Sequence, residues 1–268
     1  MLLQFDSTRG HSLRRHYPGQ VQTVGGSLVH PLSPVKGLPC QAILARPSWQ
    51  TWGVINRRER LASARLYLVC DARPDSFLTA ALRGGVDIVQ LRGKDMSDDE
   101  LLAAASRFAR VCAAHRALFI LNDRPDLVRR AGADGVHVGQ DDAPVAVARG
   151  LVGPEHLVGL STHTPSQVDA AAALQVDYIG VGPVHETPTK PGRTAVGLEL
   201  VRYAATHAQL PFFAIGGITG ANVASVRHAG ATRIAVVRAL TESRDPERVA
   251  RGLRGAVART DEVRVGCA

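Results

Sequence analysis

The chain has 268 residues, 45% of them hydrophobic, and a formal net charge of +8. This is enough for one large domain, and no run approaches the roughly 18 apolar residues that a membrane-spanning helix needs. No continuous apolar segment of the signal-peptide kind follows the N-terminus, so we expect a soluble, cytoplasmic protein with no membrane partner.

The positive charge is unevenly distributed along the chain. Residues 1–64 hold eight Lys and Arg residues against two acidic ones, which is +6 of the +8, so residues 65–268 carry only +2. The sequence also lacks aromatic residues interleaved with basic ones, the pattern of a stacking platform for nucleic acid. We therefore expect no nucleic-acid partner.

The first 64 residues show no sustained helical or strand period, and Gly, Pro, Ser and His are scattered through them. We predict a basic, poorly ordered extension at residues 1–64 and one domain at residues 65–268. Two alternatives stay open. In the first, residues 1–64 are upstream sequence included by a wrong start codon. In the second, Trp49 and Trp52 dock on the surface of the domain.

From Arg65 onward, short apolar runs alternate with helical segments. The runs are rich in Val, Ile and Leu and bounded by Gly, Pro or charge, which is typical of strands buried on both faces of a parallel sheet. The predicted strands are Leu66–Cys70, Val86–Leu91, Ala117–Leu121, Gly135–Gly139, Leu157–Ser161, Tyr178–Gly182, Phe212–Ile215 and Ile234–Val237. Helices are predicted from near Ser76 to Gly84, after Ser97, and at Pro125–Ala131, Ala143–Leu151, Pro165–Leu174, Leu198–His207, Asn222–His228 and Pro246–Ala258.

Capping signals accompany the predicted helices. Ser97 is followed three residues later by Glu100, which is a capping box, and Thr164 precedes Pro165 as an N-cap. Eight strand–helix units in succession predict an α/β fold, a single (β/α)₈ TIM barrel. The alternative is an open doubly wound sheet, which would not require eight evenly spaced units.

The cysteines show no paired spacing. Cys70 and Cys112 fall in an apolar strand and an apolar helix, and Cys40 and Cys267 lie far from both. We interpret them as small buried hydrophobes in a reduced compartment and not as zinc ligands.

Polar residues gather where the predicted strands end. In parallel α/β architectures the carboxyl ends of the strands carry the active site, so the sequence predicts one site at one mouth of the barrel. Gly216-Gly217 follows the seventh strand and Arg238 ends the eighth, at the two loops that bind a phosphate in many barrels. The alternative is that Gly216-Gly217 is only a tight turn.

Two carboxylates follow neighbouring strands. Asp123 closes the third strand and Asp142 lies just beyond the fourth, with Asn122 and Gln140 nearby. Such an oxygen-rich set suits Mg²⁺, which shares its ligand shell with substrate phosphates. Asp141 remains an alternative to Asp142 as the second ligand. The competing interpretation is that these aspartates only cap the helices that follow.

A basic set accompanies these acids. Arg92 and Lys94 follow the second strand, and Lys190 lies in the longest loop, residues 183–197. Mg²⁺, three cations and a separate phosphate cup indicate two phosphorylated substrates, one of them a diphosphate that serves as a leaving group. His137 and His163 lie near the same strand ends, each either a general base or a structural histidine.

These residues together resemble the thiamine-phosphate synthase family in order over residues 65–258. The motifs that carry the resemblance are Tyr67-Leu68-Val69, Gln90-Leu91-Arg92-Gly93-Lys94, Asn122-Asp123, Gly135-Val136-His137-Val138-Gly139-Gln140-Asp141-Asp142, Gly159-Leu160-Ser161-Thr162-His163-Thr164, Gly180-Val181-Gly182-Pro183-Val184, Thr187-Pro188-Thr189-Lys190 and Ile215-Gly216-Gly217-Ile218. The resemblance implies a (β/α)₈ barrel that joins hydroxymethylpyrimidine diphosphate to thiazole phosphate and releases diphosphate with Mg²⁺.

The resemblance also implies roles for individual residues. Asp123 and Asp142 would be the Mg²⁺ ligands, Ser161 and Lys190 would hold the diphosphate, and Arg92 and Lys94 would join them in catalysis. The residues implied to contact the pyrimidine diphosphate are Gln90, Leu91, Arg92, Gly93, Lys94 and Asn122. Those implied to cradle the thiazole phosphate are Thr187, Pro188, Thr189, Gly217, Val237 and Arg238.

Two positions depart from the family pattern, since Gly93 stands where Glu is common and Arg238 where Ser is common. We expect a dissociative displacement, in which the bond to diphosphate breaks early and the thiazole nitrogen captures a pyrimidine-stabilised cation. Two alternatives stay open, a thiazole tautomerase with a histidine acid/base and no metal, and a non-catalytic ligand-binding barrel. The sequence does not decide whether the chain forms a homo-oligomer.

Overall fold

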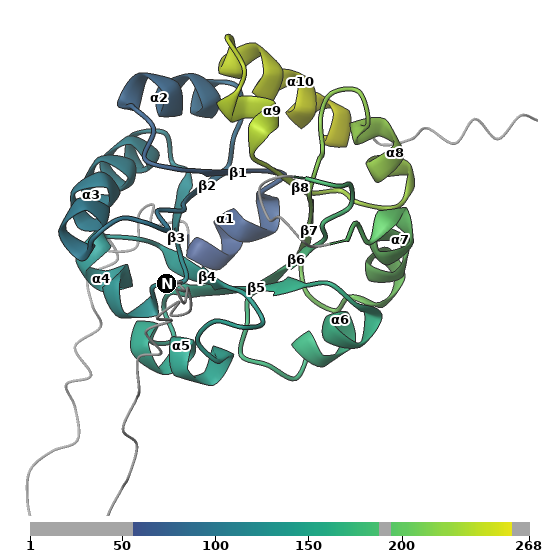
Figure 1. Ribbon diagram of the computed structural model, residues 1–268, viewed down its shortest axis with the longest axis horizontal. Coiled ribbons are helices and arrows are strands. Elements are labelled where there is room, and N and C mark those ends of the chain that lie inside the picture. Colours follow the sequence, from purple (N-terminus) through teal and green to yellow (C-terminus); the bar gives the residue numbers. More distant parts are fainter. Residues whose placement is uncertain (1–55, 188–193, 259–268) are drawn as a thin grey trace, which may run out of the picture. The chain divides into compact units, whose positions relative to one another are not determined.

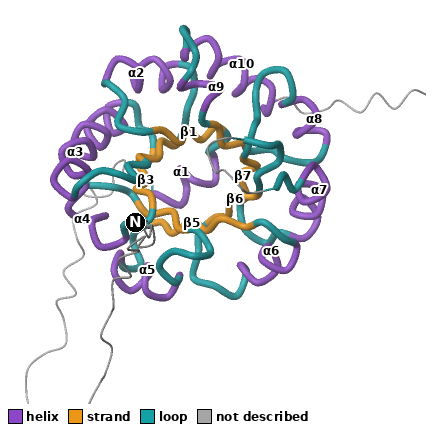
Figure 2. Tube along the Cα trace, in the orientation of Figure 1, coloured by secondary structure: helices purple, strands orange, loops and turns teal. Residues whose placement is uncertain are grey.

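The computed structural model describes residues 56–187 and 194–258. Eight parallel strands close into a barrel in chain order, with helices outside it (Figures 1 and 2). The strands are β1 (Leu66–Cys70), β2 (Ile88–Leu91), β3 (Leu118–Asn122), β4 (Gly135–Val138), β5 (Leu157–Thr162), β6 (Tyr178–Val181), β7 (Phe212–Ile215) and β8 (Ile234–Val236). Because β1 pairs with β8, the predicted TIM barrel is confirmed and the open sheet is wrong.

The helices follow the predicted order. They are α2 (Asp75–Arg83), α3 (Asp98–Ala114), the 3₁₀ turn η2 (Pro125–Leu127) with α4 (Val128–Ala131), α5 (Val145–Val152), α6 (Pro165–Ala171), α7 (Gly197–His207), α8 (Val223–His228), α9 (Arg238–Thr241) and α10 (Pro246–Ala258). The capping box of Ser97 and Glu100 is present, and the Thr164 side chain accepts from the backbone N–H of Gln167. The short helix α9 is not among the predicted elements.

The prediction of a poorly ordered extension up to residue 64 is wrong for residues 57–63. Helix α1 (Arg57–Ser63) precedes the barrel and lies at the end where the strands begin, so that in Figure 1 it is seen through the ring of strands. Leu61 and Ala64 are buried in the cluster of side chains inside the barrel. A seven-residue helix with one buried apolar side chain has no visible period in the sequence and depends on tertiary packing for its stability. Trp49 and Trp52 lie outside the described residues.

Three aspartates secure the end of the barrel where the strands begin. Asp87, Asp134 and Asp177 each stand immediately before an even-numbered strand and accept backbone N–H groups near the start of β1, β3 and β5, over 2.7 to 3.0 Å. Arginines of α1 complete two of these sites, since Arg57 binds Asp134 and Arg58 binds Asp177, each at 2.8 Å. Helix α1 is therefore tied to two strands by charge as well as by burial.

The core has two layers. One fills the inside of the barrel, and the other lies between the strands and the surrounding helices. Cys70 and Cys112 are buried in the outer layer, and burial raises the pKa of the Cys112 thiol to about 12. Both are small buried hydrophobes as predicted, whereas Cys40 and Cys267 lie outside the described residues.

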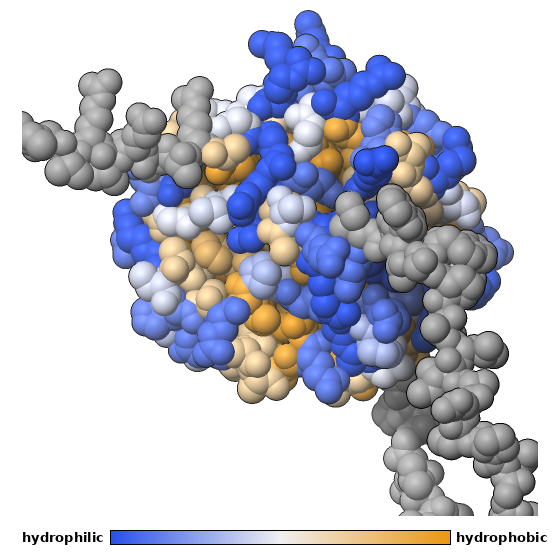
Figure 3. All heavy atoms as spheres, turned by 180° about the vertical axis from the view of Figure 1, so that it is seen from behind, coloured by the Kyte–Doolittle hydropathy of each residue, from blue (hydrophilic) through white to orange (hydrophobic). Residues whose placement is uncertain are grey.

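The surface is predominantly polar, with smaller apolar areas, on the face seen in Figure 3. The large apolar side chains that remain exposed in the described part of the chain are Val147, Leu151 and Leu174. Among the described residues, no helix is both long and apolar enough to cross a membrane.

Replacing the buried side chain of α1 tests its place in the barrel. We expect Leu61→Ala to lower the free energy of unfolding by about 3 kcal/mol, because Leu61 is 3% exposed and its removal leaves a cavity. Urea unfolding measures the loss. The matched control is Leu151→Ala, which is 43% exposed and should change stability by less than about 0.5 kcal/mol. Equal effects of the two substitutions would contradict the assignment of α1 to the core.

Candidate active site

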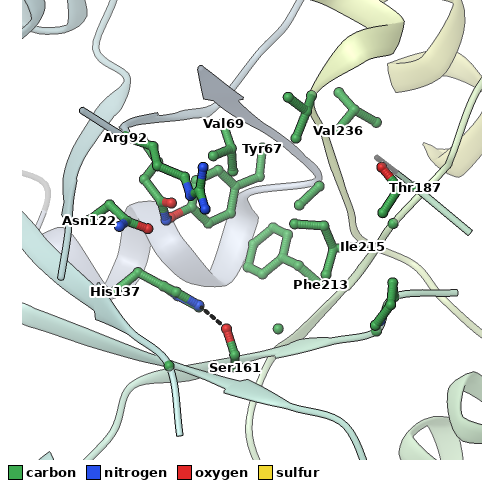
Figure 4. A pocket seen from close by; sticks show the side chains of 18 of the residues that line it. Tyr67, Val69, Arg92, Asn122, His137, Ser161, Thr187, Phe213, Ile215 and Val236 are labelled. Carbon is green, nitrogen blue, oxygen red and sulfur yellow. Dashed lines mark hydrogen bonds between the residues drawn. The ribbon is translucent and has the colours of Figure 1, made fainter. Parts of the chain in front are cut away.

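A pocket of about 560 Å³ opens at the carboxyl ends of the strands. Side chains from all eight strands or the loops after them line it. The structure brings together most of the predicted site residues there, namely Gln90, Arg92, Lys94, Asn122, Asp123, Asp142, Ser161, Thr187, Gly217, Val237 and Arg238. Figure 4 shows Arg92 and Asn122 extending into this pocket beside Tyr67 and His137.

Two predicted contact residues do not line the pocket. Leu91 is fully buried in the outer core layer, because successive residues of a strand point to opposite faces and Gln90 takes the inner one. Gly93 is also absent from the pocket lining, and a Cβ there would lie 2.4 Å from the sulfur of Met96, so any larger side chain would require Met96 to move. Pro188, Thr189 and Lys190 lie outside the described residues.

The two carboxylates share the mouth of the pocket and do not cap helices. The residue at the N-cap of η2 is Arg124 and that of α5 is Pro144, and neither helix start has a side-chain capping bond. Asp142 instead accepts the backbone N–H of Gly139 at 2.8 Å. Asp123 has a left-handed backbone with φ of 58°, an uncommon conformation that concentrates at functional sites.

The loops after β7 and β8 meet at the opposite side of the pocket. Gly216 and Gly217 have φ of 109° and 62°, which favour glycine. A Cβ on Gly216 would lie 2.5 Å from the Cα of Pro183, so the glycines also permit close packing of two loops. Arg238 lines this side, but its guanidinium lies 3.0 Å from the carboxylate of Glu242, the C-cap residue of α9.

The floor of the pocket contains aromatic residues that the sequence analysis did not assign to the site. Tyr67, Tyr178 and Phe213 pack with ring centroids 5.4 to 6.0 Å apart, two of the three pairs edge to face. Each occupies an inward position of a short strand, and alternation along β1, β6 and β7 is the signal that could have found them. Burial raises the pKa of both tyrosine hydroxyls well above the ordinary value, so both stay neutral.

The two histidines near the strand ends differ in setting. His137 Nδ1 lies 3.2 Å from the Tyr178 hydroxyl, and its Nε2 lies 3.0 Å from Ser161 Oγ, so both ring nitrogens are engaged. The Nδ1 of His163 bonds to the carbonyl of Gly182, which ties the end of β5 to the end of β6. Both histidines have structural hydrogen bonds, and both line the pocket.

Comparison with known proteins identifies the family. A family model described as thiamine monophosphate synthase matches residues 66–240, the barrel from β1 to α9. The chain belongs to the thiamine monophosphate synthase family.

Relatives in this family span different lengths. The chain is 51% identical to a thiamine-phosphate synthase of Gloeobacter violaceus over 71% of its own length but only 57% of that protein's. It is likewise 51% identical to a thiamine-phosphate synthase of Mycobacterium marinum, over 73% of this chain and 96% of that one. A solved structure, thiamine phosphate pyrophosphorylase from Pyrococcus furiosus, superposes with a TM-score of 0.68 at 30% identity, over 76% of this chain and 98% of that chain.

Gly159 tests how tightly the pocket floor is built. A Cβ there would lie 2.2 Å from Cζ of Tyr178 and 2.5 Å from Nδ1 of His137, so Gly159→Ala should displace both rings. We expect a loss of about 1–3 kcal/mol of stability from overpacking. The matched control is Gly150→Ala in α5, where nothing lies within 4 Å and a gain of roughly 0.5–1 kcal/mol is expected. Thermal or urea unfolding compares the two, and a stable Gly159→Ala protein would contradict the packing described.

Proposed function

We propose that the protein is a thiamine-phosphate synthase. It would join 4-amino-2-methyl-5-(diphosphooxymethyl)pyrimidine to thiazole phosphate, with release of diphosphate. The observation that carries this proposal is the convergence of the predicted substrate-binding residues from separate strands in one pocket, within a chain of this family. The chain spans only part of the length of some relatives. The proposed activity is therefore argued from the pocket as well as from the activity of those relatives.

The charges of the pocket support two phosphorylated substrates. Arg92 and Lys94 come from the loop after β2. The Gly216-Gly217 turn comes from the loop after β7, and Arg238 is the first residue of α9, which follows β8. One cationic region would hold the diphosphate and the other the thiazole phosphate. Ile215 and Val237, which line the pocket and are only partly buried, offer apolar surface to the two heterocycles.

The donor set fits Mg²⁺ as a cofactor. Asp123 and Asp142 line the same mouth after adjacent strands, together with Asn122, whose amide N–H donates to the Asp123 carboxylate at 2.5 Å, and Gln140. In the part of the chain that the structure describes, no group of three or more His, Cys, Asp and Glu side chains is placed to hold a metal ion. Two carboxylates suit Mg²⁺ because it keeps water molecules and takes the remaining ligands from substrate phosphates. When bound, the ion would neutralise charge on the diphosphate.

A dissociative displacement makes few demands on acid–base groups. The bond to diphosphate breaks first, and the nitrogen of the thiazole needs no deprotonation to attack the pyrimidine cation. The residues then have to hold the two substrates in line, stabilise the departing charge and exclude water. Asp123 and Asp142 line the pocket, and a metal-free tautomerase would not need them, which favours the synthase over the tautomerase. We place the enzyme in the cytoplasm, where the unpaired Cys70 and Cys112 fit a reducing environment.

The proposal is tested by mixing the purified protein with both substrates and Mg²⁺ and measuring thiamine phosphate and diphosphate. We expect the two products to appear in equal amounts and in a Mg²⁺-dependent manner. Omission of either substrate is the control. Conversion of the thiazole phosphate alone into an isomer, without diphosphate release, would favour the tautomerase instead.

A conservative substitution tests the metal site. Asp142→Asn keeps an oxygen that can accept the Gly139 N–H but removes the charge, so the loop should stay in place while Mg²⁺ binds more weakly. We expect the Mg²⁺ concentration for half-maximal rate to rise at least about tenfold. Asp141→Asn is the matched comparison and should shift it less. A larger shift for Asp141→Asn would move the metal ligand to Asp141, and no shift in either would contradict the site.

A further inference from the structure

A continuous chain of side-chain hydrogen bonds crosses the inside of the barrel beneath the pocket. Gln90 Nε2 donates to the Tyr67 hydroxyl at 2.7 Å, and the two tyrosine hydroxyls of Tyr67 and Tyr178 lie 2.9 Å apart. The Tyr178 hydroxyl lies 3.2 Å from His137 Nδ1, and His137 Nε2 lies 3.0 Å from Ser161 Oγ. Figure 4 shows the last of these bonds at the edge of the pocket.

Burial makes this chain directional. Gln90, Tyr67 and Tyr178 are 3%, 2% and 0% exposed, and both phenols stay protonated because burial raises the pKa of each. A neutral phenol has one proton, and a buried proton needs an acceptor, so a tyrosine with one neighbour that can only donate directs its own proton to the other neighbour. The orientation at one end of the chain therefore fixes the orientation along its whole length.

The amide of Gln90 sets that orientation. Its NH₂ group can only donate, so Tyr67 donates to Tyr178. Tyr178 then donates to Nδ1 of His137, which leaves the proton of the neutral imidazole on Nε2. That N–H donates to Ser161 Oγ, and the hydroxyl proton of Ser161 is left to point into the pocket that Ser161 lines.

We propose that Tyr67, Tyr178 and His137 are positioning residues that hold Ser161 as a hydrogen-bond donor toward the oxygens of the departing diphosphate. This inference rests on the proposed function. It also means that Ser161 is not a nucleophile, because Nε2 of His137 has no lone pair left to take its proton. A donor fixed before the substrate arrives stabilises developing negative charge without reorganisation during the reaction.

The barrel leaves room for this chain by means of Gly159. In the strand register His137 lies beside Gly159, and Gly159 lies beside Tyr178. A Cβ on Gly159 would lie 2.5 Å from both the Tyr178 hydroxyl oxygen and His137 Nδ1, the two atoms that this hydrogen bond joins. Gly180 faces the other edge of the imidazole, with its nearest atom at 3.5 Å from the position of a Cβ. The register thus places the His137 ring beside Tyr178, and Gly159 leaves the space for the hydrogen bond between them.

The tautomer of His137 can be read without substrate. The full chain labelled with ¹⁵N-histidine, with His137→Gln to assign the signal, would be studied by long-range ¹H–¹⁵N correlation NMR. We expect a neutral imidazole with its proton on Nε2 in the wild type. Tyr178→Phe removes the donor to Nδ1 and should give a mixture of tautomers. Tyr203→Phe is the matched control, since that hydroxyl bonds Asp169 on the outer surface and should leave the signal unchanged.

Kinetics then connects the chain to Ser161. Tyr178 is fully buried and acts only through its neighbours, so Tyr178→Phe should lower kcat roughly tenfold, the effect of weakening one hydrogen bond in the transition state, with KM for the pyrimidine diphosphate nearly unchanged. Tyr203→Phe should keep both constants. A proton on Nδ1 of His137 in the wild type, or wild-type kcat in folded Tyr178→Phe, would overturn the proposal. Absence of thiamine phosphate from the wild-type enzyme would overturn the proposed function alone, because the tautomer is measured in the ligand-free protein.

Discussion

The closed parallel barrel constrains everything else in this structure, because it gives its inward side chains a fixed and small volume. Every second residue of each strand points into that volume. Toward the starts of the strands it is filled by apolar residues such as Leu118, Leu157 and, from α1, Leu61. Toward the carboxyl ends the inward positions change to Gln90, Asn122 and other polar residues, so the same alternation that fills the core also builds the pocket.

The transition from core to pocket occurs in the polar chain between Gln90 and Ser161. Buried polar groups are costly when unpaired, and a network is stable only if each member has its partner. Here two phenols and an imidazole satisfy one another inside the barrel. The arrangement places hydrogen-bonded, oriented groups directly beneath the pocket, and the edge-to-face contacts of Phe213 keep the two tyrosine rings in place.

Aspartates at the two ends of the barrel make different contacts. At the end where the strands begin, Asp134 and Asp177 bind backbone N–H groups and the arginines of α1. Their carboxylates therefore hold neighbouring strands together. At the other end the carboxylates of Asp123 and Asp142 cap no helix and face the pocket. The same residue type thus holds strands together at one end and lines the pocket at the other, according to its position relative to the strand.

The sequence by itself determined the order of the strands and helices, the barrel, and the mouth at which the polar residues meet, because short apolar runs and strand ends are local patterns. It also indicated the family and most residues of the pocket. Only the tertiary structure decided the place of α1, whose arginines find their partners about 77 to 119 residues away in the sequence. It likewise decided that Leu91 faces the helices, and that Tyr67, Tyr178 and His137 form one hydrogen-bonded chain. Those contacts depend on the strand register, and a register is a relation between distant segments that no local pattern contains.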